Sequence, residues 1–201
     1  MSLVKTKLFV VGFLSTNCYI VNDFEKQAII IDPGIENNSD LKNITSYIKE
    51  KCLEIKFIVN THGHSDHVSG NIKIQNEYKC PICIHEKDAP LIENSNEMSR
   101  IRKLKDEDLL DFGKTSFKII STPGHTLGGI SLLGENIVFT GDTLFSKGIG
   151  RMDFPGGSKK DMKKSLEKIM ALPEKYIVYP GHGSITSIGE EKIGNPFFNW
   201  L

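Results

Sequence analysis

The sequence has no excess of charge of either sign, because its 25 lysines and arginines balance its 25 aspartates and glutamates. Proteins that bind nucleic acid or an anionic membrane usually carry a basic surplus, so neither is expected as a partner. No run of 18 apolar residues occurs, and Met1–Lys7 lacks the basic segment and apolar core of an export signal. We therefore expect a cytoplasmic protein with a small-molecule partner, and the sequence does not indicate its oligomeric state.

Cysteine is scarce, with four in 201 residues. Cys80 and Cys83 have the CxxC spacing, but no second CxxC or nearby histidine pair completes a thiolate zinc site. Cys83 also lies in an apolar, strand-like segment, which favours a structural role for this pair over a redox or metal-binding one. Cys18 and Cys52 lie in or beside apolar segments and are expected to be small core residues.

The length of 201 residues, with 39% hydrophobic and 25% charged residues, indicates one globular domain covering 1–201. Short apolar segments typical of strands recur along it. They lie at 8–13, 18–21, 28–31, 55–59, 81–84, 115–120, 130–133, 137–140 and 176–179. Two sets of strands, each followed by a helix, favour two packed sheets with helices outside.

Amphipathic spacing predicts two helices between these strands. One begins at Ser39 or Asp40, and the other is capped by Ser158 and ended by Pro173. A shorter helix is expected over 69–78. The charged stretch 86–108 is expected to be a loop with broken helix.

Five of the predicted strands end in glycine-containing turns that also carry a carboxylate or an imidazole. These turns are Asp32-Pro33-Gly34, Thr61-His62-Gly63-His64, Thr122-Pro123-Gly124-His125, Thr140-Gly141-Asp142 and Pro180-Gly181-His182. Functional side chains concentrate on loops held by rigid strands, and glycine permits the tight backbone of such loops. If all five strands end at the same edge, the loops converge on one site.

The segment His62-Gly63-His64-Ser65-Asp66-His67 places four potential metal ligands within six residues. Imidazole is costly to bury without a partner, and three crowded copies beside a carboxylate suit a cation better than one another. The segment follows an apolar strand and precedes a helix-like stretch. On such a strand-to-helix turn the ligands can point in two directions and reach two adjacent metals.

Together with the strand-end residues, this segment predicts a metal centre with seven ligands. They are His62, His64, Asp66, His67, His125, Asp142 and His182. Seven ligands are too many for one tetrahedral ion, so we expect two divalent metal ions. A natural division gives His62, His64 and His125 to one ion. Asp66, His67 and His182 would hold the other. Asp142 would lie between the two. Nitrogen and oxygen donors without thiolate favour zinc and also accommodate iron or manganese.

Two cations about 3.5–4 Å apart lower the pKa of a water and polarise the group that it attacks. The reaction class that follows is hydrolysis of an ester, thioester or amide carbonyl, or of a phosphoester. Asp66 could also orient the proton of the attacking water, which would make it a catalytic residue. Asp32 could align a ligand histidine from behind, or it could form a plain Asx turn. His85, outside the set, is expected to be structural.

Four segments together resemble the metallo-β-lactamase superfamily. They are His62-Gly63-His64-Ser65-Asp66-His67, Pro123-Gly124-His125, Gly141-Asp142-Thr143-Leu144-Phe145 and Pro180-Gly181-His182. Their order and spacing match that superfamily across nearly the whole chain. The resemblance implies an α/β fold, the four-layer αββα sandwich, in which two mixed sheets pack face to face with helices outside. It also implies a two-metal site at one edge.

Within that superfamily, the segments 141–145 and 148–151 are most similar to glyoxalase II, the hydroxyacylglutathione hydrolases, and especially to short bacterial members. The resemblance implies a thioesterase for S-acylglutathione-type substrates that uses zinc, or zinc and iron. Arg151 matches a basic position near the glutathione moiety. It could meet a substrate carboxylate, or it could form a salt bridge with Asp153. Larger members have a C-terminal helical domain with further glutathione contacts that finds no counterpart in these 201 residues, so thioester hydrolysis is a firmer expectation than glutathione itself.

The segment 150–157 is also similar to persulfide dioxygenases. Those enzymes bind one iron through positions that match His62, His125 and Asp142, and they commonly retain the other histidines. An iron-dependent persulfide dioxygenase is therefore an alternative, although 142–145 fits the glyoxalase II pattern better. A non-catalytic metal-binding domain is a third alternative, against which the complete ligand set argues. Lactamase and nuclease activities are weaker hypotheses, because the sequence has no export segment and no basic surplus.

Overall fold

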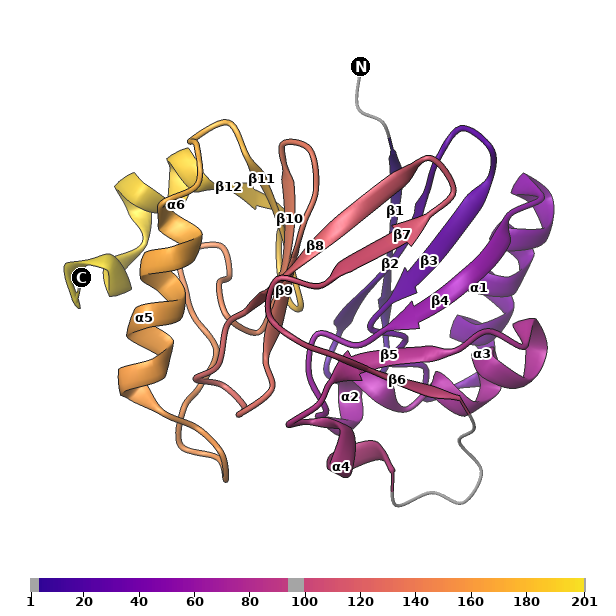
Figure 1. Cartoon of the computed structure of the whole chain (residues 1–201), viewed down its shortest axis with the longest axis horizontal. Helices are drawn as coiled ribbons and strands as arrows, with labels where there is room; N and C mark the ends of the chain where they lie inside the picture. The colour runs from indigo at the N-terminus through magenta and orange to yellow at the C-terminus, as the bar shows by residue number, and fades with distance from the viewer. Residues whose placement is uncertain (1–3, 94–99, 201) are drawn as a thin grey trace.

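The computed structural model describes residues 4–93 and 100–200 (Figure 1). Within these residues two six-stranded sheets pack face to face, with helices against their outer faces. This arrangement confirms the predicted four-layer αββα sandwich.

The first sheet is formed by the N-terminal strands in the order β1-β2-β3-β4-β5-β6. They are β1 (Lys5–Val11), β2 (Thr16–Asn22), β3 (Gln27–Ile31), β4 (Glu54–Val59), β5 (Ile82–His85) and β6 (Ile101–Leu104). The first two pairings are antiparallel, whereas β3 to β6 run parallel. Parallel neighbours need crossover connections. The helices that follow β3, β4 and β5 are α1 (Asn38–Lys51), α2 (Ser65–Val68), α3 (Asn71–Tyr78) and α4 (Ala89–Ile92).

The second sheet has the order β12-β11-β10-β9-β8-β7. Its strands are β7 (Leu109–Phe112), β8 (Thr115–Ser121), β9 (Ile130–Leu133), β10 (Ile137–Gly141), β11 (Ile177–Pro180) and β12 (Thr186–Ser187). Only β10 and β11 pair in parallel, and α5 (Lys159–Met170) connects them. The chain continues through α6 (Ile188–Gly194) and a 3₁₀ helix (Pro196–Trp200). Among the described residues, no helix is both long and apolar enough to span a bilayer.

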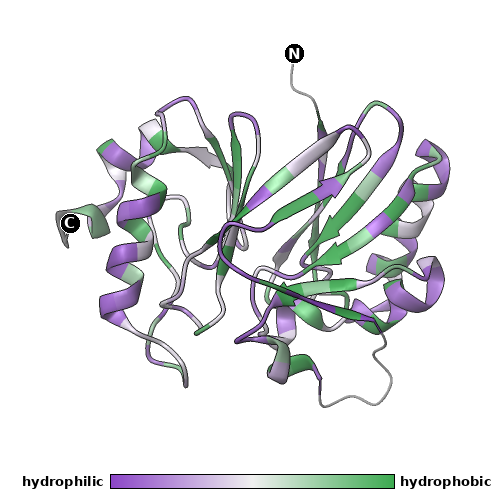
Figure 2. Ribbon diagram, viewed as in Figure 1, coloured by the Kyte–Doolittle hydropathy of each residue, from purple (hydrophilic) through white to green (hydrophobic). Residues whose placement is uncertain are grey.

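The apolar side chains form one core between the sheets and one beneath each helical layer. Successive residues of a strand point to opposite faces, so Ile29 and Ile31 enter the core between the sheets while Ile30 packs under α1 with Ile44. Because both faces are covered, the central strands are continuously apolar, as Figure 2 shows in green. The outward surfaces of α1 and α5 are largely hydrophilic in the same view.

The start of α1 differs slightly from the prediction. Asn37 is the N-cap, with its side chain accepting a hydrogen bond from the backbone N–H of Asp40. Asp40 instead lies in the first helical turn, where its charge complements the helix dipole. In α5, Ser158 is the N-cap as predicted, and the helix ends at Met170, ahead of Pro173.

Two further predictions need correction. The stretch 86–108 contains loop and the short helix α4, as predicted, but also the strand β6, which was not predicted; residues 94–99 lie outside the described residues. Cys52 is exposed and not a core residue. It is the C-cap of α1 in the left-handed conformation (φ 52°), and this helix end lies at the surface. Cys18, Cys80 and Cys83 are buried.

Candidate metal centre

The structure brings all seven predicted ligands together at one edge of the sandwich. The loop after β4 and the start of α2 carry His62, His64, Asp66 and His67, and the loops after β8, β10 and β11 carry His125, Asp142 and His182. Ligand atoms of His62, His64 and His125 lie within 4.8 Å of one another. Those of Asp66, His67 and His182 form a second such group. We call the first the three-histidine group and the second the Asp66 group.

Asp142 lies between the two groups. Its Oδ1 is 3.4 Å from Nε2 of His67, and its Oδ2 is 3.4 Å from Nε2 of His125. Nε2 of His182 is also 3.7 Å from Oδ2, so the carboxylate faces histidines of both groups. A carboxylate in this position could bind two cations at once.

The close approach of basic nitrogens fits bound cations better than a network of hydrogen bonds. Nε2 of His62 is 3.1 Å from Nδ1 of His64, and Nε2 of His67 is 3.2 Å from Nε2 of His182. Nε2 of His125 and Oδ1 of Asp142 are buried without a hydrogen-bond partner among the described residues. A buried polar atom without a partner costs about 1–3 kcal/mol. Cations placed among these atoms would satisfy them, so the donor set suits divalent metal ions.

The far sides of the histidine rings are held by oxygen atoms. Nδ1 of His125 lies 2.7 Å from the carbonyl oxygen of Arg151, and Nδ1 of His182 lies 3.2 Å from that of Leu14. A carbonyl oxygen only accepts, so Nδ1 carries the proton in both rings. The lone pair of each Nε2 therefore points into the cluster, which is the tautomer that a metal requires.

Asp32 lies behind two of the ligand histidines. Its carboxylate accepts hydrogen bonds from N and Oγ1 of Thr61 at 2.8 and 2.7 Å, and its Oδ2 is 3.0 Å from Nδ1 of His67. Because the Thr61 hydroxyl donates to Asp32, it accepts from Nδ1 of His62, 3.2 Å away. The Asp32 backbone is left-handed (φ 50°), a conformation that aspartate adopts more readily than most residues. These contacts favour the alignment role over a plain Asx turn.

Burial and charge shift the pKa values of His62 and His67 in opposite directions. Burial, reinforced by the charge of His67, lowers the pKa of His62 well below its ordinary value. Burial would also lower the pKa of His67, but Asp32 and Asp142 outweigh it and raise this pKa to about 9. Burial would raise the pKa of Asp66, yet the hydrogen bond from His182 and the charge of His67 hold it below its usual range. A metal ion would take the place of these protons.

Arg151 lies at the rim and is engaged by Asp153. Its Nε and Nη2 donate to the two oxygens of Asp153 at 2.8 and 2.7 Å. The guanidinium also stacks 3.9 Å from the ring centroid of Phe154, which in turn is 5.7 Å from the ring of His64. The salt bridge considered as the alternative for Arg151 is therefore present. A contact with substrate stays a prediction.

His85 lies apart from the cluster. It is buried, its Nδ1 accepts from the backbone N–H of Lys87 at 3.2 Å, and its Nε2 is 3.2 Å from Oγ of Ser121. These contacts suit the structural role expected of it.

Three supporting residues were missed by sequence reasoning. Thr16 donates from Oγ1 to Oδ2 of Asp66 at 3.2 Å. Asn17 donates from Nδ2 to the carbonyl oxygens on either side of the His182 loop, at 3.0 and 2.9 Å. The carboxylate of Asp88 accepts hydrogen bonds from the backbone of two loops of the cluster. Asn17 could have been found, because a polar side chain within an otherwise apolar strand signals a buried partner.

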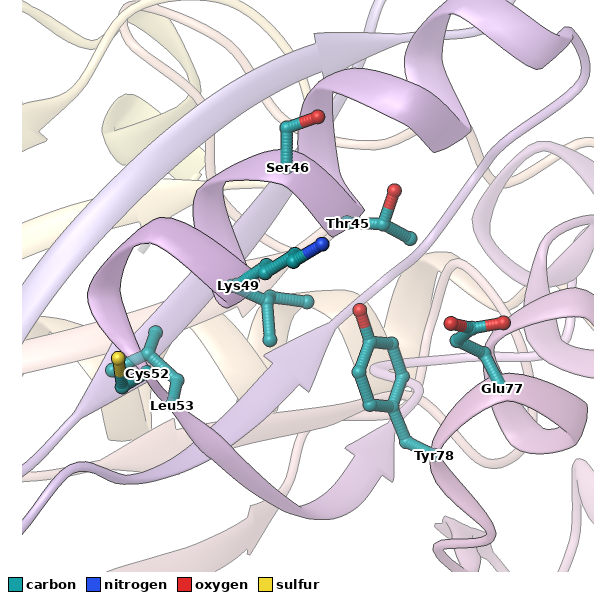
Figure 3. A pocket seen from close by; sticks show the side chains of 8 residues that line it. Thr45, Ser46, Lys49, Cys52, Leu53, Glu77 and Tyr78 are labelled. Carbon is teal, nitrogen blue, oxygen red and sulfur yellow. The ribbon is translucent and has the colours of Figure 1, made fainter.

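A separate cavity of about 400 Å³ lies between α1 and α3 (Figure 3). Lys49, Cys52, Glu77 and Tyr78 are among its lining residues, and it shares none with the cluster. Both helices end beside it, at the edge where β4 and β5 begin. The cavity therefore lies at the opposite end of the first sheet from the metal centre.

Known proteins are similar to this chain in sequence and in architecture. The sequence pattern of the Metallo-beta-lactamase superfamily matches residues 11–182. Hydroxyacylglutathione hydrolase GloC from Haemophilus influenzae is 36% identical over 200 residues, covering 91% of this chain and 92% of GloC. The structure of TTHA1623 in a di-iron-bound form superposes with a TM-score of 0.85 at 30% identity, covering 95% and 99% of the two chains. ETHE1 from Myxococcus xanthus superposes with a TM-score of 0.82 at 29% identity, covering 96% of this chain and 83% of ETHE1. The chain therefore belongs to the metallo-β-lactamase superfamily.

Proposed function

We propose that the protein is a metal-dependent hydrolase that cleaves thioesters of the S-acylglutathione type. The observation that carries this proposal is the pair of ligand groups that face each other across Asp142. A two-metal centre of this donor type suits hydrolysis of an activated carbonyl. The similarity to hydroxyacylglutathione hydrolase GloC supports a thioester as the substrate.

Two divalent ions are the cofactors in this proposal. When bound, they supply a water of lowered pKa and polarise the carbonyl that it attacks. The three-histidine group would hold one ion, the Asp66 group the other, and Asp142 would bridge them. The nitrogen and oxygen donors favour zinc, and the di-iron form of TTHA1623 supports iron as the alternative.

Asp66 is the residue that we propose to orient the attacking water. Its side chain is 15% exposed, so it borders the space that a substrate can reach, and Oγ1 of Thr16 donates a hydrogen bond to its Oδ2. Because its pKa is lowered, the carboxylate stays ionised at neutral pH. An ionised carboxylate accepts a hydrogen bond from the water and holds its oxygen toward the carbonyl, although so weak a base does not remove the proton by itself.

Arg151 is the proposed contact for a carboxylate of the carrier thiol. Its ion pair with Asp153 is exposed on both sides, and such pairs contribute little to stability. A substrate carboxylate can therefore take the place of Asp153 at the guanidinium without disturbing the fold. The stack on Phe154 would keep the guanidinium beside the cluster during this exchange.

A persulfide dioxygenase is the second candidate, and the similarity to ETHE1 favours it. In that activity His62, His125 and Asp142 would hold one iron; Nε2 of His125 is 3.4 Å from Oδ2 of Asp142. One paired experiment separates the two candidates. Metal content per chain is measured, and the protein is then assayed with S-lactoylglutathione without oxygen and with glutathione persulfide in air.

Two metals per chain and thiol release without oxygen are expected. One iron per chain, with oxygen uptake and sulfite formation, would instead establish the dioxygenase. A protein that binds metal and turns over neither substrate would support the non-catalytic alternative.

A further inference from the structure

The carboxylate of Asp88 joins the two loops that carry the three-histidine group. Its Oδ2 accepts from the backbone N–H of Gly63 at 3.0 Å, and its Oδ1 accepts from that of Gly128 at 2.7 Å. Gly63 stands between His62 and His64 in the sequence, and Gly128 follows His125 by three positions. One carboxylate thus ties the loop after β4 to the loop after β8.

Asp88 is itself held rigidly at this place. It is 1% exposed, and its backbone N–H donates to the carbonyl oxygen of His85 at 3.0 Å in the turn that begins α4. A Cβ on Gly128 would lie 2.6 Å from both the backbone nitrogen and Oδ1 of Asp88. The backbones of Gly128 and Asp88 therefore approach each other closely, which is possible because glycine has no side chain. Hydrogen bonds to a buried carboxylate are about twice as strong as neutral ones, so this contact fixes the spacing of the loops.

The Asp66 group depends on a different carboxylate. Asp32 contacts His67 directly and reaches the loop after β4 through Thr61. Both hydrogen-bond partners of the Asp88 carboxylate belong instead to loops of the three-histidine group. Asp32 thus supports His67 directly and His62 through Thr61, whereas Asp88 contacts only the backbones beside the histidines of the three-histidine group.

We propose that Asp88 is a positioning residue that assembles the three-histidine position selectively. The proposal rests on the metal centre of the proposed function. Loss of a supporting partner behind a metal ligand typically lowers metal affinity by about 10- to 100-fold. In Asp88→Asn one oxygen still accepts, but the amide NH₂ faces a backbone N–H, so one of the two loop contacts is lost. The three-histidine position should weaken, while the Asp66 group keeps its geometry.

The test measures Asp88→Asn in two backgrounds that each leave one metal position. His182→Ala leaves the three-histidine position, and His64→Ala leaves the Asp66 group. Zn²⁺ affinity is measured by competition with a chromophoric chelator, and metal per chain by elemental analysis. Asp88→Asn should weaken Zn²⁺ binding about 10- to 100-fold in the His182→Ala background. In the His64→Ala background the change should stay within about 2-fold, the range within which uncoupled changes add, because the contacts of Asp32 with Thr61 and His67 are intact.

Asp23 offers a matched control. It is 2% exposed, and its carboxylate accepts from the backbone N–H groups of Gln27 and Lys114 at 2.9 and 2.8 Å, which ties together two turns away from the cluster. Asp23→Asn should lower thermal stability to a similar extent and leave Zn²⁺ affinity unchanged. If Asp88→Asn does not fold, Gly128→Ala separates the same loops with the carboxylate intact and should give the same selective loss.

Equal weakening of both positions, or of neither, would overturn the assignment of Asp88 to one position. Weakening by Asp23→Asn as well would show a general effect of stability and would also overturn it. A parent protein that binds no metal would instead refute the proposed function. Two metals in the parent with an unaffected Asp88→Asn would refute only the present inference.

Discussion

Replacement of Gly181 by alanine tests how closely the loop after β11 packs against the cluster. Gly181 precedes His182, and a Cβ at this position would lie 2.3 Å from Oδ1 of Asp142 and 2.8 Å from Cε1 of His67. Real Cβ atoms essentially never approach other atoms within 3.0 Å. The φ of Gly181 lies outside the left-handed region, so the cost of the added methyl group is steric and not conformational.

The loop has little freedom to relieve this clash by moving. The backbone N–H of Gly181 donates to the carbonyl oxygen of Gly141 at 2.8 Å, and its own carbonyl accepts from the N–H of Asn17 at 2.8 Å. The strain therefore falls on Asp142 and His67. Overpacking by one methyl group typically costs about 1–3 kcal/mol. If this cost is borne by the ligands, it corresponds to a loss of metal affinity of about 5- to 150-fold.

The assay is Zn²⁺ competition against a chelator, together with thermal unfolding of the metal-free protein. Gly194→Ala is the control, because a Cβ at the end of α6 meets no atom within 4 Å. We expect Gly181→Ala to lose affinity and Gly194→Ala to keep it. Parental affinity and stability in Gly181→Ala would refute the close packing of this loop against the bridge between the ligand groups.

Further predictions concern the bridge, the metals and the thiols. Asp142→Ala should lower metal content and hydrolysis together, since Asp142 faces both ligand groups, and full activity would remove the bridging assignment. Removal of metal with a chelator should lower the melting temperature. A metal ion at 100 times its Kd stabilises the folded protein by about 2.7 kcal/mol, so an unchanged melting curve would contradict this prediction. Iodoacetamide at pH 8 should label the exposed Cys52 first, and Cys80 and Cys83 only after unfolding, as measured by mass spectrometry. The reason is that burial raises the pKa values of Cys80 and Cys83 to about 11 and about 12. The raised thiol pKa values also predict that the free energy of unfolding falls as the pH rises above about 8.5, because the thiols ionise there in the unfolded chain and stay neutral in the folded one. A free energy of unfolding that does not fall in denaturant titrations from pH 7 to 10 would contradict this prediction.

Among the strands that sequence reasoning found, β2 and β3 are buried almost throughout. The segment 28–31 is continuously apolar because one face meets α1 and the other meets the second sheet. Two of the strands that it missed, β6 and β7, lie at sheet edges and carry exposed residues. In β6 the two central residues, Arg102 and Lys103, are exposed, and in β7 exposed and buried residues alternate. Edge strands of this kind contain too few apolar residues to stand out from a charged loop.

The ligand positions could be predicted because each one follows an apolar strand within a few residues. The supporting residues could not, since their roles depend on distant partners. Asp88 stands 25 and 40 positions from the two amides that it binds. Its local context, directly before Ala89 and Pro90, indicates an ordinary helix cap, yet its side chain makes no capping hydrogen bond to α4. The carboxylate binds the metal-bearing loops instead, and nothing in the local pattern signals this.

The division of the ligands between the two sheets determines which mutations should affect both ligand groups and which should affect one. The first sheet supplies His62 and His64 to one group and Asp66 and His67 to the other, while the second sheet completes each group with one histidine. Each of the two proposed metal positions therefore takes ligands from both sheets. A shift of the core between the sheets would displace both positions at once. The buried Tyr19 helps to set this core, because its hydroxyl donates to the carbonyl oxygen of Pro180 at 2.7 Å, directly before the His182 loop. Asp88, by contrast, contacts the loops after β4 and β8 and not the loop of His182, so we expect its replacement to separate the two metal affinities, which a change within the core would not do.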